Sequence, residues 1–141
     1  MILEGNVITD DRGCVRFVND FDFKNVKRFY QVENHRAGFI RAWHGHNNES
    51  KYVYVAKGSA LVAAIPLQDM VNGITTTIHK YVLSANKPSI LFIPAGMANG
   101  FKTLEENTIV QFFSTSSLEE SQQDDIRFAY DFVNIWEEDY R

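Results

Sequence analysis

Two histidines stand two residues apart in the segment Arg41-Ala42-Trp43-His44-Gly45-His46, which is rich in strand-forming residues. Side chains two residues apart on a β-strand lie on the same face of a sheet, so His44 and His46 are expected to point the same way. Two imidazoles on one face can ligate a metal ion or transfer protons near neutral pH. The residues around this segment decide between the two roles.

Short apolar runs separated by turn residues continue on both sides of this segment. We expect strands near residues 15–18, 26–32, 39–44, 52–56, 60–65, 75–83, 90–93 and 108–114. Glycines close to the breaks make this the pattern of an all-β sandwich or barrel. Asp11-Arg12-Gly13 and Asn72-Gly73 each predict a tight hairpin turn.

The character of the chain changes beyond Ser117. Residues 118–125 are polar and acidic, and residues 126–136 carry apolar side chains at mixed spacing. We expect a short helical or irregular tail packed over the sheet edge. The carboxylates of this tail are expected to form a solvated acidic surface: Glu119, Glu120, Asp124 and Asp125.

Composition limits the classes of function. The chain has 141 residues, of which 45% are hydrophobic and 23% charged, as in a soluble globular domain. No basic block offsets the net charge of −4, which disfavours nucleic acid as a partner. The single cysteine, Cys14, excludes an intrachain disulfide and suits a reducing compartment. With no signal-peptide pattern and no membrane-length apolar run, we expect a cytoplasmic protein without a membrane partner.

The histidine segment and the later Pro94-Ala95-Gly96 resemble the two sequence motifs of the cupin superfamily. This resemblance implies an all-β cupin jelly-roll over residues 1–141, forming a single domain. Metal-binding cupins carry a glutamate where this chain has Lys51, and a histidine where it has Asn99, while Glu49 lies two residues too early. Two imidazoles are fewer ligands than zinc or iron sites usually need, so we expect neither a metal nor another cofactor.

Further segments extend a narrower resemblance over nearly the whole chain. Some are similar to dTDP-4-dehydrorhamnose 3,5-epimerases, namely residues 11–13, 41–44, 83–86 and 93–101. Others are similar to dTDP-sugar 3,4-ketoisomerases, namely residues 26–30, 41–46 and 125–132. The resemblance implies an isomerase of a nucleotide-linked 4-keto-6-deoxy sugar, most simply a dTDP-sugar, in deoxysugar or surface-glycan biosynthesis.

The same resemblance assigns roles to individual residues. It implies that His44 is the base that removes a proton next to the ketone, and that Lys51 stabilises the oxyanion that develops there. His46 and Tyr30 are further candidates for proton transfer. The expected substrate-binding residues are Arg12 and Arg41 for the phosphates, Phe17 and Gln31 for the nucleotide, and Asn99 in the pocket wall. Strict alternation would put Arg41 on the opposite face from His44 unless the strand carries a bulge.

The chain departs from the double epimerases at two positions. Alignment of residues 58–65 with the strand after the glycine turn puts Pro66 where those enzymes carry an aspartate that supports the base, and residues 114–117 lack their acid tyrosine. Inversion needs groups on both faces of the sugar, whereas 3,4-ketoisomerisation can use His44 and His46 on one face. The subclass stays open, and a cupin that binds a sugar nucleotide without turnover is the alternative.

The resemblance also implies a homodimer in which the N-terminal strands of each subunit extend the sheet of its partner. An open sheet rich in aromatic residues needs such cover at its edge.

Overall fold

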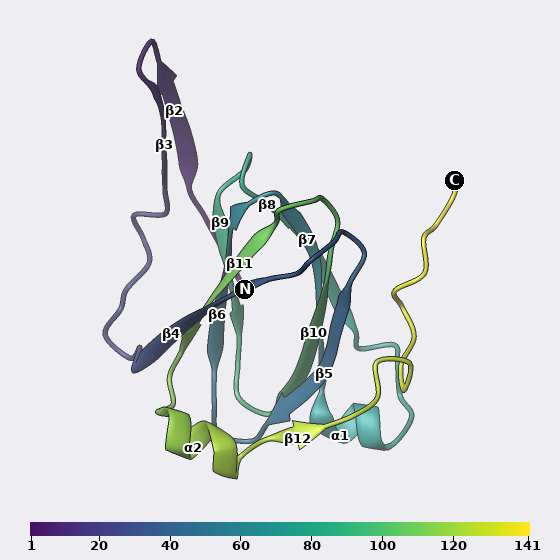
Figure 1. Cartoon of the computed structure of the whole chain (residues 1–141). Coiled ribbons are helices and arrows are strands. Elements are labelled where there is room, and N and C mark those ends of the chain that lie inside the picture. The colour runs from purple at the N-terminus through teal and green to yellow at the C-terminus, as the bar shows by residue number, and fades with distance from the viewer.

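Two five-stranded antiparallel sheets face each other in the computed structural model, which describes residues 1–141 (Figure 1). The first sheet has the order β1 (Ile2–Glu4), β9 (Ser89–Ile93), β6 (Lys51–Lys57), β11 (Ile109–Ser114) and β4 (Arg28–Glu33). The second has the order β12 (Ile126–Arg127), β5 (Ile40–His46), β10 (Met97–Thr103), β7 (Ser59–Pro66) and β8 (His79–Ser84). This architecture confirms the all-β prediction.

The main hydrophobic core fills the space between the two sheets. Along β6, Val53 and Val55 point inward while Tyr52 and Tyr54 lie on the other face, as the two-residue period of a strand requires. Inward side chains of the second sheet complete this core, among them Val62 and Phe101.

A second core covers the outer face of the second sheet. Trp43 of β5 packs there against Trp136 of the C-terminal segment, with ring centroids 5.2 Å apart. The Trp43 Nε1–H donates to the backbone carbonyls of Tyr130 and Val133, at 3.2 and 3.1 Å. The C-terminal segment is therefore fixed behind the strand that carries the two histidines.

The tail contains α2 (Leu118–Gln123) and β12, followed by irregular chain, which agrees with the expected helical or irregular tail. A capping box starts α2, because Ser117 Oγ accepts from the backbone N–H of Glu120 and the Glu120 carboxylate accepts from that of Ser117. β12 then pairs with β5 at the sheet edge, and α2 and β12 lie at the same end of the molecule as α1 (Leu67–Val71) (Figure 1).

Three predictions about local structure were wrong or incomplete. Asn72-Gly73 is not a tight hairpin between β7 and β8, because α1 follows β7, buries Leu67 and Met70, and ends at Asn72-Gly73. The strand expected at 75–83 begins only at His79. Strand β10 was not among the expected strands, and its sequence Met-Ala-Asn-Gly-Phe-Lys-Thr shows neither clear alternation nor a continuous apolar run.

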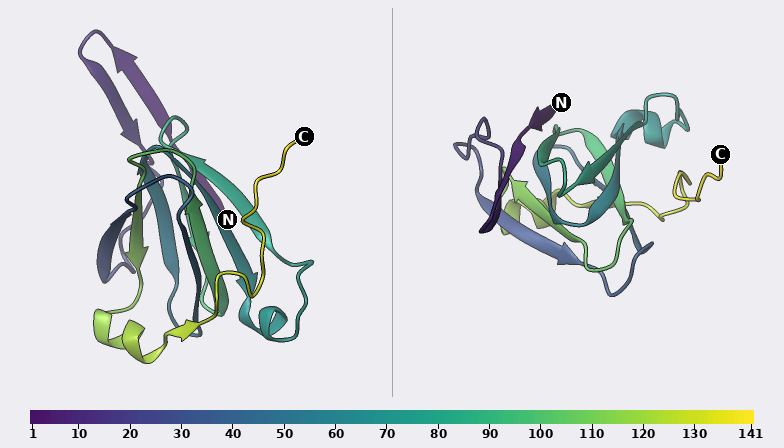
Figure 2. Two further views of the ribbon diagram at one scale, coloured as in Figure 1. Left: turned by 45° about the vertical axis from the view of Figure 1, so that its right-hand side comes forward. Right: turned by 90° about the horizontal axis from the view of Figure 1, so that it is seen from above.

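The predicted hairpin at Asp11-Arg12-Gly13 is confirmed by the pairing of β2 (Asn6–Asp10) with β3 (Gly13–Phe17). These two strands form a ribbon separate from both sheets, which projects beyond the end opposite α2 (Figures 1 and 2). Its apolar side chains Ile8 and Val15 are exposed. None of the helices is long and apolar enough to cross a membrane.

Candidate active site

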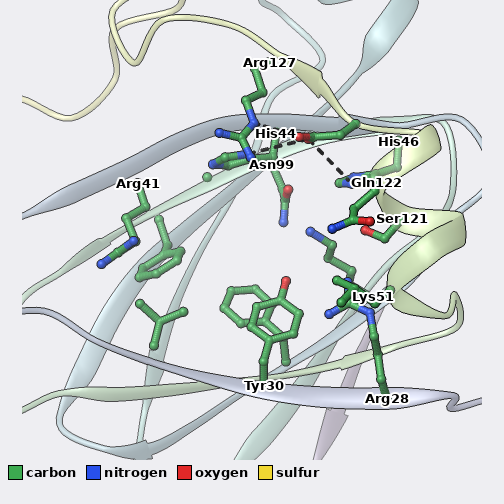
Figure 3. A pocket seen from close by; sticks show the side chains of 16 residues that line it. Arg28, Tyr30, Arg41, His44, His46, Lys51, Asn99, Ser121, Gln122 and Arg127 are labelled. Carbon is green, nitrogen blue, oxygen red and sulfur yellow. Dashed lines mark hydrogen bonds and ion pairs between the residues drawn. The ribbon is translucent and has the colours of Figure 1, made fainter.

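A cavity of about 350 Å³ lies between the sheets, and three residues of α2 line it, namely Leu118, Ser121 and Gln122. Side chains from both sheets, α2 and β12 line it (Figure 3). Six of the predicted site residues are among them: Tyr30, Arg41, His44, His46, Lys51 and Asn99.

The two histidines occupy one face of β5, as the sequence predicts. In the antiparallel pair with β10, His44 lies opposite Asn99, and the side chains of both reach the cavity. Gly45, between His44 and His46, faces the opposite side of the sheet, where a Cβ would overlap Leu67 of α1. The Gly45 position therefore lets β5 pack closely on α1 while both imidazoles stay on the cavity side.

Arg41 reaches the same cavity because β5 is bulged. The register between β10 and β5 shifts at Asn99/Gly100, so that Gly100 pairs with Ala42 and Phe101 with Arg41. Ala42 and Trp43 both pack on the outer core, which returns Arg41 to the face of His44. Gly100 permits this arrangement, since a Cβ there would overlap the Ala42 Cβ and lie 3.0 Å from its Cα.

Asp125 is the main site residue that sequence reasoning missed. One of its oxygens, Oδ1, lies 4.0 Å from Nδ1 of His44 and 4.0 Å from Nε2 of His46, so a single carboxylate faces both imidazoles. Its other oxygen accepts a hydrogen bond of 2.7 Å from Nε of Arg127. Asp125 is exposed, as the sequence predicts, but its carboxylate also lines the cavity, which the sequence analysis did not expect.

The neighbouring Asp124 stabilises the turn between β5 and β6. Its carboxylate accepts hydrogen bonds from the backbone N–H groups of Asn47, Asn48 and Glu49, at 2.8, 2.8 and 3.1 Å. Asp124 thereby fixes the turn that leads from His46 to Lys51 and ties it to the segment that carries Asp125. A sequence signal for this segment existed, since residues 125–132 were among those that resemble ketoisomerases.

Buried charges form one wall of the cavity. Lys51 at the start of β6 is 8% exposed, and its ammonium lies 3.7 Å from Oε2 of Glu49. Burial lowers the pKa of Lys51, and the Glu49 carboxylate opposes that shift. Burial and then the charge of Lys51 lower the pKa of both His44 and His46. Both imidazoles are therefore favoured in the neutral form, in which a histidine can accept a proton.

Aromatic side chains form the wall opposite the histidines. Tyr30 of β4 stacks on Phe112 of β11 with ring centroids 4.9 Å apart, and its hydroxyl points into the cavity (Figure 3). Burial, followed by the charge of Glu49, raises the pKa of the Tyr30 hydroxyl, so this group keeps its proton at neutral pH. The cavity thus has proton acceptors on one wall and a proton donor on the other.

Three predicted substrate-binding residues lie outside this cavity. Arg12 is at the exposed tip of the β2–β3 hairpin, where its guanidinium pairs with Asp10 at 2.6 Å. Phe17 ends β3, away from the cavity lining. Gln31 lies on the outer face of β4, because the inward positions of that strand are taken by Arg28, Tyr30 and Val32.

β7 contains no aspartate, in agreement with the sequence alignment that puts Pro66 where the double epimerases carry one. Pro66 pairs with Met97 at the end of β7, while the β7 residue in line with His44 and Asn99 is Ala64. The carboxylate that faces both histidines comes from Asp125 instead. No group of three or more His, Cys, Asp or Glu side chains is arranged to hold a metal ion.

Comparison with known proteins identifies the family of the chain. The family described as dTDP-4-dehydrorhamnose 3,5-epimerase matches residues 1–138 of the chain. The spore coat polysaccharide biosynthesis protein SpsL of Bacillus subtilis (strain 168) is 27% identical, with 94% of this chain and 91% of that protein covered.

Two solved structures show the same fold. One is dTDP-4-dehydrorhamnose 3,5-epimerase from Bacillus anthracis str. Ames with TDP and PPi bound, at 24% identity and a TM-score of 0.76, covering 96% of this chain and 83% of that chain. The other is a 3,4-ketoisomerase from Helicobacter canadensis, at 16% identity and a TM-score of 0.69, covering 96% of each chain. These similarities confirm the cupin jelly-roll. The chain belongs to the dTDP-4-dehydrorhamnose 3,5-epimerase family of dTDP-sugar isomerases.

Proposed function

We propose that the protein isomerises a nucleotide-linked 4-keto-6-deoxy sugar, most simply a dTDP-sugar, by removing a proton next to the ketone. The observation that carries this proposal is the placement of one Asp125 oxygen 4.0 Å from both His44 and His46, inside a cavity that also contains Lys51. No metal or other cofactor takes part in the proposed reaction.

His44 is the base in this proposal. Asp125 faces its Nδ1 atom and therefore favours the tautomer with the proton on Nδ1, which leaves Nε2 free to accept a proton from carbon. A separation of 4.0 Å is longer than a hydrogen bond, and such contacts commonly shorten once substrate is bound. Burial lowers the pKa of His44, which keeps the base neutral.

The proton transfer creates a negative charge that Lys51 can stabilise. When the C3–H bond breaks, its electrons form a C3=C4 double bond and the ketone oxygen becomes an oxyanion. An ammonium group held in a site with little water stabilises such an oxyanion strongly. Lys51 lies on the cavity wall beside His46, which supports this role for its ammonium group.

The fate of the intermediate distinguishes two reactions. If a proton returns to C4 on the histidine side while the hydroxyl proton moves from O3 to O4, the product is a 3-keto sugar, and we assign this second transfer to His46. If a proton returns to C3 from the opposite side, the carbon is inverted, and the Tyr30 hydroxyl lies on that wall (Figure 3). Both routes start with proton removal by His44.

The nucleotide diphosphate is proposed to bind at the cavity mouth. Arg41 and Arg127 line the cavity. One guanidinium group can donate hydrogen bonds to two phosphate oxygens at once. Nε of Arg41 donates to Oδ1 of Asn34 at 2.7 Å, which fixes the side chain while its terminal nitrogens stay available.

We also propose a homodimer with exchanged N-terminal strands. The β2–β3 ribbon lies apart from both sheets and exposes Ile8 and Val15, which a partner's sheet would cover. In such a dimer, Arg12 and Phe17 are available to the partner's cavity. The free Cys14 on this ribbon suits the cytoplasm, and the name of the B. subtilis relative suggests a role in surface-polysaccharide synthesis.

Solvent isotope exchange tests the proposed reaction. The protein is incubated with dTDP-4-keto-6-deoxyglucose in deuterated water, and the sugar is followed by NMR. Deuterium incorporation at C3, or at C3 and C5, with a 4-keto product would indicate epimerisation, and a 3-keto product would indicate ketoisomerisation. Retained binding of the substrate without exchange or product would instead support the non-catalytic alternative.

A further inference from the structure

Glu49 is a charged side chain that lies behind the cavity wall. Its side chain has no exposed surface and does not line the cavity, yet its carboxylate contacts three cavity-lining side chains. Oε2 lies 3.7 Å from the Lys51 ammonium and 3.8 Å from Nε2 of His46, and Oε1 lies 3.5 Å from Nη2 of Arg28. Oε2 has no hydrogen-bond partner of its own, and neither does the buried Nε atom of Arg28.

The turn between β5 and β6 holds this carboxylate in place. The backbone N–H of Glu49 donates to Asp124, and that of Ser50 donates to Oγ1 of Thr115 at 2.9 Å. The position of Glu49 is therefore set by backbone contacts on both sides of the turn, while its charge faces the cavity-lining cations.

Burial of a carboxylate lowers the stability of the folded state unless the carboxylate compensates nearby positive charges. Lys51 is almost as buried, and the positive Arg28 lies near the same carboxylate. If Glu49 were neutral, these two cations would share a poorly solvated space without a counter-ion between them. The chain thus has the charged Glu49 at a buried position where an apolar or amide side chain would fill the same volume.

We propose that Glu49 is a positioning residue that keeps the Lys51 ammonium charged and directed into the cavity, and this inference rests on the proposed function. Glu49 itself does not touch the substrate. It acts through Lys51, whose positive charge is needed when the oxyanion develops.

The titratable surroundings of Lys51 agree with this role. Burial lowers the pKa of Lys51 and the Arg28 charge lowers it further, whereas Glu49 and, more weakly, Asp125 raise it. The titratable and charged groups around Lys51 are Glu49 from the turn, Arg28 and Tyr30 from β4, His44 and His46 from β5, and Asp125 and Arg127 after α2. Removing the Glu49 charge leaves only the weaker Asp125 effect, so the Lys51 pKa should fall.

The first test measures Lys51 directly. The ¹³Cε resonance of Lys51, assigned with Lys51→Met, is titrated by NMR without substrate in the wild type, Glu49→Gln, Glu49→Asp and the exposed control Glu119→Gln. We expect the midpoint to fall in Glu49→Gln, to fall less in Glu49→Asp and to stay unchanged in Glu119→Gln. An unchanged midpoint in folded Glu49→Gln would overturn the proposal.

The second test measures turnover in the same variants. In Glu49→Gln, kcat should fall by less than the about 10²- to 10³-fold that loss of an oxyanion-stabilising group costs. KM should stay within a few-fold of the wild-type value. The basic limb of the pH–rate profile should move to lower pH, because Lys51 loses its proton there. A lower kcat with an unshifted basic limb would assign Glu49 a purely structural role.

The outcomes separate this inference from the proposed function. The NMR midpoint needs no turnover, so an inactive wild type would contradict the proposed function while the titration still decides whether Glu49 keeps Lys51 charged. If Glu49→Gln does not fold, the conservative Glu49→Asp decides. Failure of both variants to fold would assign Glu49 to stability alone and overturn the proposal.

Discussion

Oδ1 of Asp125 lies 4.0 Å from Nδ1 of His44, although the two residues are far apart in the sequence. Pairing of β12 with β5 brings them together, since Ile126 pairs with Gly45 and Arg127 with His44. The C-terminal segment is thus part of the candidate active site and supplies the carboxylate that β7 lacks.

Replacement of Asp125 by asparagine should slow turnover. The amide would no longer favour the His44 tautomer with a free Nε2, nor stabilise the imidazolium after proton transfer. We expect kcat to fall by about 10²- to 10⁴-fold, the range that general acid–base catalysis contributes. The exposed Asp131→Asn serves as the control, and equal activity of the two variants would remove Asp125 from the mechanism.

The Asp124 carboxylate should contribute to stability in a pH-dependent way. Although burial raises the pKa of Asp124, its three backbone hydrogen bonds outweigh burial and hold the pKa below the ordinary value of 3.8. The stabilisation is therefore present above about pH 4 and lost as the pH falls through the lowered pKa of the folded state. Asp124→Ala should lower the free energy of unfolding by about 1.5–3 kcal/mol near neutral pH.

Urea denaturation of the wild type and Asp124→Ala at several pH values checks this expectation. The difference between the two proteins should shrink below pH 4. A difference that stays constant across this range would show that the carboxylate charge does not stabilise the turn.

Substitution of Gly100 by alanine should disturb the bulge that brings Arg41 to the cavity. The new Cβ would overlap Ala42, and such overpacking typically costs about 1–3 kcal/mol of stability. Affinity for dTDP should fall as well, which calorimetry can measure. Arg41→Ala should reproduce the loss of affinity without the loss of stability, whereas unchanged binding by both variants would exclude Arg41 from the phosphate site.

The pH dependence of kcat/KM should reflect the burial of His44. Burial, followed by the charge of Lys51, lowers the pKa of His44 below its ordinary value of 6.5. The base must be neutral, so activity should persist below pH 6.5 and decline only at more acidic pH. An acid limb above pH 6.5 would contradict this environment.

Lys51→Met removes one of the causes that lower the pKa of His44. The NMR titration midpoint of His44 should therefore rise in this variant, independently of any effect on turnover. An unchanged midpoint would indicate that the Lys51 charge does not reach His44.

Local periodicity predicted much of the fold and half of the candidate site. The two-residue period placed His44 and His46 on one face, and the sequence also indicated that Arg41 needs a bulge to join them. The bulge itself was not predictable, because it depends on the close approach of Gly100 to Ala42 across two strands. β10 escaped prediction because this central strand has paired neighbours on both sides, and its burial is not reflected in an apolar run.

Asp125 was missed for a different reason. Its position depends on the pairing of a two-residue strand with β5, and an acidic segment after a helix usually lies in solvent. In the sequence, the position where related enzymes carry a supporting carboxylate is Pro66, which lies at the end of β7. Only the three-dimensional arrangement identifies the carboxylate beside the histidines.

Deuterium exchange by His44→Asn tests the central claim most directly. The variant and the wild type are incubated with dTDP-4-keto-6-deoxyglucose in deuterated water, and incorporation next to the ketone is followed by NMR, with dTDP affinity as the control for an intact site. We predict that His44→Asn loses exchange and product formation while dTDP affinity stays within a few-fold. Exchange at the wild-type rate in His44→Asn would contradict the assignment of His44 as the base.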